Sequence, residues 1–137
     1  MNSLNGKIAK AELARAIVAI LVEKKALDVK LYEVGEENPI TDFYVNATGR
    51  SHTHVSSLAD DVVDKLSEAE VAPLRVEGRR GDSWILVDYG DVILNIFDRE
   101  SREFYNLDRL MPAQTLNDIS DIIHEVDKKL EISNKED

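Results

Sequence analysis

The sequence contains no cysteine. Without cysteine there are no disulfides and no thiolate metal sites, so a disulfide-stapled secreted scaffold is excluded. No stretch approaches the roughly 18 consecutive apolar residues that read as a membrane-spanning helix. The N-terminus also lacks the apolar core of a signal peptide. We therefore expect a soluble, cytoplasmic protein of a reducing compartment, with no membrane partner.

Basic residues are scarce as well. The chain has 17 lysines and arginines against 27 aspartates and glutamates, a formal net charge of −10. Such a chain repels phosphate backbones, so direct sequence-specific binding of nucleic acid is not expected. The acidity suits a basic protein partner, although it would also serve solubility alone.

The chain has 137 residues and an apolar fraction of 43%. This length allows one domain with a substantial core. We expect a single domain over residues 1–132 and a polar, frayed C-terminal tail over 133–137.

Two apolar runs, Trp84–Val87 and Val92–Phe97, stand at the centre of the sequence. The short polar gap between them predicts a β-hairpin, with a three-residue loop that ends in a left-handed Gly90. Both strands are apolar on both faces, which predicts helices on both sides of the sheet. Asn95 is the polar exception, and we expect it to hydrogen-bond within the core or at its edge.

The rest of the chain predicts three helices, three further strands and two connecting segments. Apolar stripes predict the helices, whereas alternation and β-forming residues predict the strands. The expected helices span 7–25, 52–69 and 115–130; the strands span 28–34, 41–48 and 74–77; residues 98–101 form a turn, and 104–107 are extended or a short helix. The resulting fold class is α/β, with a mixed five-stranded sheet flanked by helices.

Groups that could carry catalysis are incomplete. His52 and His54 lack cysteines and carboxylates at ligand spacing, so no metal site is expected, and Ser51 is predicted to cap the following helix. A strand followed by Gly49-Arg50-Ser51 and a helix resembles the phosphate cradle of nucleotidyltransferases. Those enzymes carry two carboxylates on the next strand, where this chain has only Glu77 beside Arg75. We expect no catalytic residues and no cofactor.

Several segments together resemble one known family. They are Thr41–Val45 with Gly49 and Ser51, Val55 with Leu58–Asp60, Pro73 with Glu77-Gly78, Trp84–Val92 running to Ile96-Phe97, and Arg102 with Phe104-Tyr105 and Leu107–Leu110. On these motifs the chain resembles the ribosomal silencing factor family RsfS, also called Iojap. The resemblance covers about residues 8–125 and departs at Asn95 and Met111, where the family often has histidine and tryptophan.

The resemblance implies a non-catalytic protein with a nucleotidyltransferase-like fold. It implies binding to large-subunit ribosomal protein fourteen on the face that meets the small subunit. Occupying that face would block subunit association and repress translation when nutrients are limiting. Organelle relatives imply a role in large-subunit biogenesis as an alternative, and a nucleotidyltransferase-like enzyme or a homodimerisation module are others.

Aromatic side chains ringed by acidic groups suit a basic ribosomal protein. We expect the hairpin tip to be exposed, and core packing of the aromatic pair at 104–105 remains an equal alternative. Core or partly core packing is favoured for the tryptophan. The residues expected to bind the partner are Trp84, Asp88, Tyr89, Asp91, Phe104, Tyr105, Leu107, Arg109 and Leu110.

Overall fold

The structure is a computed structural model that describes residues 3–35, 37–78 and 83–136; for 3–8 and 133–136 only the backbone is described. The elements are α1 (Ser3–Glu23), β1 (Leu27–Glu33), β2 (Phe43–Thr48), α2 (His52–Glu68), β3 (Arg75–Glu77), β4 (Trp84–Asp88), β5 (Val92–Phe97), α3 (Arg99–Tyr105), the 3₁₀ turns η1 (Leu107–Leu110) and η2 (Ala113–Thr115), β6 (Leu116–Asn117) and α4 (Ser120–Glu136). None of the helices described is long and apolar enough to cross a membrane.

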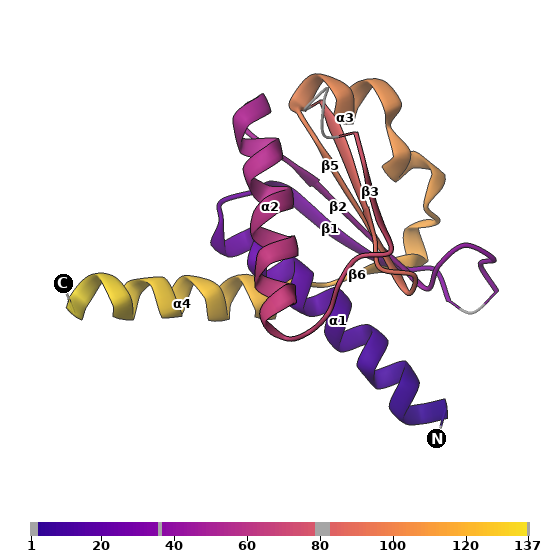
Figure 1. Ribbon diagram of the computed structural model, residues 1–137, viewed down its shortest axis with the longest axis horizontal. Helices are drawn as coiled ribbons and strands as arrows, with labels where there is room; N and C mark the ends of the chain where they lie inside the picture. Colours follow the sequence, from indigo (N-terminus) through magenta and orange to yellow (C-terminus); the bar gives the residue numbers. More distant parts are fainter. Residues whose placement is uncertain (1–2, 36, 79–82, 137) are drawn as a thin grey trace.

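The described strands form one mixed sheet in the order β3-β4-β5-β2-β1-β6. Only the β2–β5 pair is parallel, and the other neighbours are antiparallel. The α/β class and the flanking helices were predicted correctly. The hairpin of β4 and β5 also lies inside the sheet, as expected (Figure 1).

The sheet has six strands rather than the predicted five. The sixth is β6, which pairs antiparallel with β1 through Leu116 and Asn117. The sequence placed Leu116 in the last helix because it continues that helix's apolar spacing. The helix begins only at Ser120, whose backbone N–H donates a 2.9 Å hydrogen bond to the Asp118 carboxylate, a contact typical of helix starts.

The main core lies on one face of the sheet. Alternate residues of β5, namely Val92, Leu94 and Ile96, are fully buried there. They pack with the apolar sides of α1, α2 and α4, which cover this face. Figure 1 shows α1 and α2 crossing the sheet on this side, while α4 projects away from the body. Burial of this apolar area is the main stabilising term of the fold.

The opposite face is covered by a segment whose conformation the sequence left open. Residues 98–101 were expected as a turn, but α3 begins at Arg99. The Asp98 carboxylate caps it by accepting a 2.7 Å hydrogen bond from the Ser101 N–H. The helix ends at Asn106, whose φ of 47° is left-handed, and η1 follows directly. We call residues 99–110 the surface segment.

The hairpin loop has a different register from the one predicted. The Tyr89 N–H donates a 2.9 Å hydrogen bond to the Val92 carbonyl, which leaves Gly90 and Asp91 as a two-residue loop. Gly90 adopts a φ of 86°, as a two-residue loop with glycine in first place requires. The predicted exposure of Tyr89 is therefore wrong, because its ring turns into the main core and is 8% exposed.

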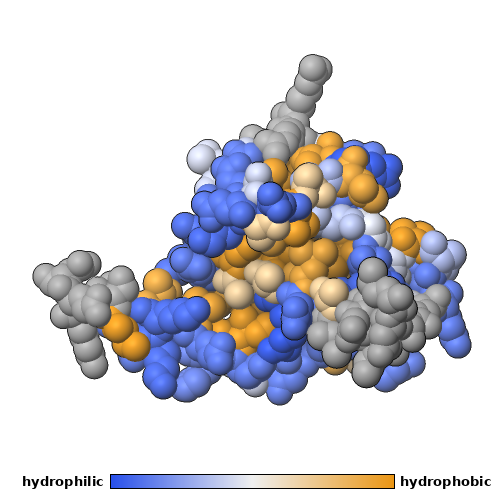
Figure 2. Space-filling model, turned by 60° about the horizontal axis from the view of Figure 1, so that its bottom comes forward, coloured by the Kyte–Doolittle hydropathy of each residue, from blue (hydrophilic) through white to orange (hydrophobic). Residues whose placement is uncertain are grey.

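The C-terminal region also differs from the prediction. The backbone of α4 is helical through Glu136, so residues 133–136 of the expected tail extend the helix; Asp137 lies outside the described residues. Between α1 and α4 lies a hollow of about 270 Å³, lined by Ala19, Glu23, Val126, Lys129 and Leu130. Figure 2 shows apolar residues gathered in the middle of this side of the molecule, between hydrophilic ones.

The Tyr89 hydroxyl provides a test of this packing. It is buried without a hydrogen-bond partner among the described residues, and burial raises the pKa of Tyr89 to about 12. Tyr89→Phe removes an unsatisfied polar group, so the free energy of unfolding should stay unchanged or rise by up to about 1 kcal/mol. Urea denaturation measures this difference.

Tyr32 supplies the matched control, because its hydroxyl donates a 2.7 Å hydrogen bond to Asp108. Tyr32→Phe should lower the free energy of unfolding by about 1–2 kcal/mol. Equal losses in the two variants would mean that Tyr89 is not packed as described.

Candidate functional site

Four aromatic rings lead from the core to the surface on the second face of the sheet. Phe97 is fully buried at the end of β5, and its ring centroid lies 5.1 Å from that of Trp84 on β4. Trp84 in turn lies 4.7 Å from Tyr105 at the end of α3. Phe104 meets Tyr105 edge-on at 5.0 Å and is 78% exposed. The buried rings thereby support exposed ones.

Several predicted partner-binding residues lie together on the surface segment. Phe104, Tyr105 and Leu110 are 78%, 48% and 68% exposed, which rules out core packing as the main role of the aromatic pair. Arg109 is also exposed, while Leu107 is half-buried between them in the chain. Exposed large apolar side chains on a short segment are typical of a protein-binding surface.

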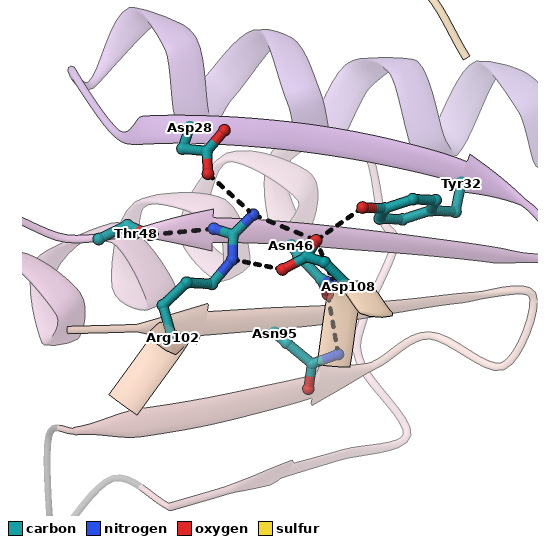
Figure 3. Close-up of polar contacts among 7 residues, drawn as sticks. All are labelled: Asp28, Tyr32, Asn46, Thr48, Asn95, Arg102 and Asp108. Carbon is teal, nitrogen blue, oxygen red and sulfur yellow. Dashed lines mark hydrogen bonds and ion pairs between the residues drawn. The ribbon is translucent and has the colours of Figure 1, made fainter. Parts of the chain in front are cut away.

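The carboxylate of Asp108 holds the surface segment on the sheet (Figure 3). One oxygen, Oδ1, accepts hydrogen bonds from the Tyr32 hydroxyl at 2.7 Å and from the Asn46 amide at 3.1 Å. Arg102 donates through Nε to Oδ2 at 2.7 Å and through Nη2 to Oδ1 at 3.2 Å. The carboxylate therefore ties η1 to α3, β1 and β2 at once, with bonds of the stronger, charge-assisted kind from Arg102.

Arg102 is itself nearly buried, with a side chain 9% exposed. Besides Asp108, its guanidinium donates a 2.9 Å hydrogen bond from Nη1 to the Thr48 hydroxyl at the end of β2. Nη2 also lies 3.5 Å from the Asp28 carboxylate on β1. A buried guanidinium needs such partners, because an unpaired buried charge is strongly destabilising.

A chain of amides joins this cluster to the aromatic rings. The Trp84 indole N–H donates to Asn95 Oδ1 at 3.0 Å, and Asn95 Nδ2 donates to Asn46 Oδ1 at 3.2 Å. Asn46 then donates to Asp108. Asn46 and Asn95 stand opposite each other in the parallel β2–β5 pair, so their side chains share a face. The predicted hydrogen bonding of Asn95 in the core is confirmed. We call these residues, with Arg102, Thr48 and Tyr32, the polar network.

The network also determines how its members ionise. Burial alone would raise the pKa of Asp108, but hydrogen bonds from Arg102, Tyr32 and Asn46 outweigh it and lower that pKa below its ordinary value. Burial, followed by the hydrogen bond to Asp108, raises the pKa of Tyr32. At neutral pH the network therefore contains an ionised carboxylate and a neutral phenol.

The predicted hairpin-tip residues have structural partners of their own. Asp88 accepts a 2.7 Å hydrogen bond from the Gly90 N–H and lies 3.2 Å from Arg75 Nε, so it shapes the loop. Asp91 lies 3.7 Å from the ammonium of Lys10. With Tyr89 buried, the tip is not the free aromatic and acidic surface that the sequence predicted, and charge reversal at Asp88 would disturb the turn itself.

The histidine-containing helix start is structural. Ser51 caps α2 as predicted, because its hydroxyl accepts a 3.1 Å hydrogen bond from the His54 N–H. Both ring nitrogens of His54 are engaged, one with the Arg50 N–H at 2.9 Å and the other with the Lys24 carbonyl at 3.0 Å. His52 pairs with Asp98 at 2.9 Å. Within the described ranges, no three acidic or histidine side chains are grouped to hold a metal ion.

The strand that would bear a catalytic carboxylate pair is β3. Its one carboxylate, Glu77, lies 3.1 Å from Arg75 Nη1, and Arg75 also contacts Asp88. Exposed Arg75 and Glu77 and the mostly covered Asp88 form an ion-pair group at the edge of the sheet. The carboxylates of Glu77 and Asp88 are thus both paired with the Arg75 guanidinium.

The comparisons with known proteins agree with these motifs. A family model described as "Ribosomal silencing factor during starvation" matches residues 7–137, nearly the whole chain. The chain belongs to the ribosomal silencing factor family. A ribosomal silencing factor of Zymomonas mobilis is 32% identical over 98 residues, covering 72% of this chain and 74% of that protein. One from Haemophilus influenzae is 33% identical over 99 residues, covering 69% and 97%.

Solved structures support the same family fold. A crystal structure of a Chromobacterium violaceum protein has a TM-score of 0.71 and 29% sequence identity, covering 74% of this chain and 84% of that one. A Bacillus halodurans crystal structure has a TM-score of 0.69 and 28% identity, covering 79% and 98%. A mouse relative, 26% identical over 74% of this chain and 46% of that protein, is named "Mitochondrial assembly of ribosomal large subunit protein 1". The family is described by silencing, not by a catalysed reaction.

Sequence reasoning missed most of the polar network. It singled out Asn95, but Asn46, Tyr32 and Asp108 were not connected to it. The available signal was one asparagine in the middle of each of two apolar strands, at 46 and 95. Their pairing depends on the parallel register of β2 and β5, which a single sequence does not specify.

The lowered pKa of Asp108 predicts a pH dependence of stability. Because the folded pKa lies below the unfolded value of 3.8, the contribution of Asp108 is complete above that value. It is lost as pH falls through the folded pKa. At pH 7, Asp108→Asn should lower the free energy of unfolding by about 1–3 kcal/mol, and the gap should narrow below about pH 3.8.

Urea denaturation from pH 7 to pH 3 measures this gap. Asp121→Asn is the matched control, since Asp121 pairs with Arg15 while its side chain is 67% exposed. That variant should change stability little at any pH. A gap for Asp108→Asn that stays constant down to pH 3 would contradict the assigned role of the ionised carboxylate.

Proposed function

We propose that this protein binds large-subunit ribosomal protein fourteen through the surface segment and blocks association of the large and small ribosomal subunits. The observation that carries the proposal is the exposure of Phe104, Tyr105 and Leu110 on a segment fixed from beneath. Membership of the silencing family supports a ribosomal target. The reaction is a binding event, and its output is repression of translation.

The fixed conformation of these side chains favours tight binding. Ordering a mobile loop on association costs free energy that subtracts from affinity. Here the cost is already met in folding, because Tyr105 packs against Trp84 and the chain beyond Asn106 is tied down through Asp108. Aromatic and large aliphatic residues presented in this way are the usual energetic centres of interfaces.

Charge favours a basic partner. The net charge of −10 gives the protein a negative overall field, which accelerates encounter with a positively charged ribosomal protein. Arg99 and Arg109 are exposed cations of the surface segment. In this account Asp88 and Asp91 at the hairpin tip contribute negative charge that acts at a distance, and they do not contact the partner directly.

The mechanism is steric exclusion. A large-subunit protein that lies at the junction with the small subunit cannot be occupied by this protein and by the small subunit together. Silencing then requires only an affinity that competes with subunit joining, and no chemical step. Large subunits bound by this protein are withdrawn from the joining equilibrium, so by mass action fewer joined ribosomes form.

A second candidate function is assembly of the large subunit, favoured by the printed name of the mouse relative. It would use the same surface, because an assembly factor must also recognise the large subunit. The two functions separate in an assay with mature subunits. A silencing factor lowers the fraction of joined ribosomes, whereas an assembly factor alone leaves it unchanged.

Leu110→Ala tests the proposed surface. If this exposed side chain fills a pocket on the partner, its loss should weaken binding to cognate large subunits by about 2 kcal/mol, roughly thirty-fold. Stability should hardly change, since the side chain is 68% exposed. Pelleting with large subunits measures the affinity, and sucrose-gradient sedimentation with both subunits measures joining.

Leu74→Ala is the matched control. Leu74 is an equally large side chain, 73% exposed, that lies outside the surface segment. It should bind and inhibit joining as the parent does. The proposed surface is refuted if the two single variants Leu110→Ala and Phe104→Ala both bind as the parent does. It is also refuted if Leu74→Ala loses as much affinity as Leu110→Ala.

A further inference from the structure

We infer that Asp108 is the positioning residue of the binding surface: its contacts with Arg102, Tyr32 and Asn46 hold the surface segment in the one arrangement that the partner recognises. This inference rests on the proposed function and assigns a role that acts beneath the contact surface. Asp108 has a side chain only 18% exposed, and Arg102 one 9% exposed. Neither is placed to offer a large contact area to a partner.

The surface segment cannot hold its own shape. α3 has seven residues and η1 has four. An isolated helix in water needs about 12–15 residues for marginal stability, so both are too short to be stable alone. The two pieces are separated by the left-handed Asn106. Their arrangement must therefore come from contacts with the rest of the protein.

Those contacts do not come from the main core. Among the described residues, the buried apolar cluster between the sheet and α1, α2 and α4 contains no member of the surface segment. What ties the segment down is the Trp84–Tyr105 ring contact at one end and the polar network at the other. The segment can thus open while the main core stays folded.

Asp108 is the point where these ties converge. Through Arg102 it joins η1 to α3, and through Tyr32 and Asn46 it joins η1 to β1 and β2. Asn46 also leads through Asn95 to the indole of Trp84. One carboxylate therefore fixes η1, the turn that bears Leu110, and is linked through the two asparagines to the indole on which Tyr105 rests.

Replacing the carboxylate should populate an open segment. In Asp108→Asn the guanidinium of Arg102 loses its bidentate partner, and the Tyr32 hydroxyl and Asn46 amide lose a charged acceptor. Apparent affinity falls in proportion to the fraction of molecules that remain closed. The loss appears without removal of any side chain that touches the partner.

The experiment uses Trp84, the single tryptophan of the chain, as a reporter. Its indole contacts Tyr105 and donates to Asn95, so opening of the segment exposes it to water. For Asp108→Asn we expect binding to cognate large subunits at least tenfold weaker. Trp84 emission should shift to longer wavelength and be quenched more by acrylamide. Far-ultraviolet circular dichroism should keep most of the parent's helix content, because the longer helices α1, α2 and α4 stay folded.

Three further variants make the outcome decisive. Asp121→Asn makes the same chemical change in the exposed ion pair with Arg15, and it should leave both binding and emission unchanged. Leu110→Ala should weaken binding without moving the emission, because Leu110 makes none of the ring contacts of Trp84. The double variant Arg102→Gln with Asp108→Asn should bind no more weakly than the weaker-binding of the two single variants. Both substitutions break the same contact, that between Arg102 and Asp108.

The inference is overturned if Asp108→Asn binds as the parent does, or if it binds weakly while Trp84 emission stays at the parent's position. Parent-like binding by both Leu110→Ala and Phe104→Ala would instead overturn the proposed function and leave the emission result to decide the positioning role. If Asp108→Asn does not fold, Tyr32→Phe decides, since it removes a single donor. In Tyr32→Phe, a shift of Trp84 emission together with about threefold weaker binding supports the inference, and binding equal to the parent's overturns it.

Discussion

The Asp108 carboxylate accepts hydrogen bonds from Tyr32, Asn46 and Arg102, and the arrangement of the surface segment depends on these bonds. A buried charge is stable only when its partners are complete, so the network has one satisfied arrangement and no easy alternatives. That property suits a recognition surface. The apolar residues above it are displayed in a fixed geometry, although the helical pieces that bear them are too short to be stable alone.

The two faces of the sheet are stabilised by different physics. On one face, β5 presents Val92, Leu94 and Ile96 to three helices, and burial of apolar area supplies most of the folding free energy. On the other face, Asn46 and Asn95 replace apolar residues at the centre of the sheet. This division separates stability from recognition, because substitutions in the network can disturb the surface segment while the main core stays packed.

The sequence was sufficient for the elements whose signals are local. The apolar runs of the β4–β5 hairpin, the stripe of α2 and the Ser51 cap each carry their own pattern. It failed where distant partners decide. β6 exists because Leu116 pairs with Tyr32, and Tyr89 lies outside the loop because the loop begins at Gly90, two residues later than predicted. The exposed rings at 104–105 were found, but the carboxylate beneath them was not, since its partners come from three separate parts of the chain.

Hydrogen exchange with and without cognate large-subunit protein fourteen tests the central claim most directly, because it locates the contact on the native chain without any substitution. Binding through a fixed surface segment predicts slower amide exchange across residues 99–111 and at the start of β4, where Trp84 supports Tyr105. Exchange in α2 and in the projecting half of α4 should not change. Protection confined to α2 or α4, with residues 99–111 exchanging as in the free protein, would contradict the account.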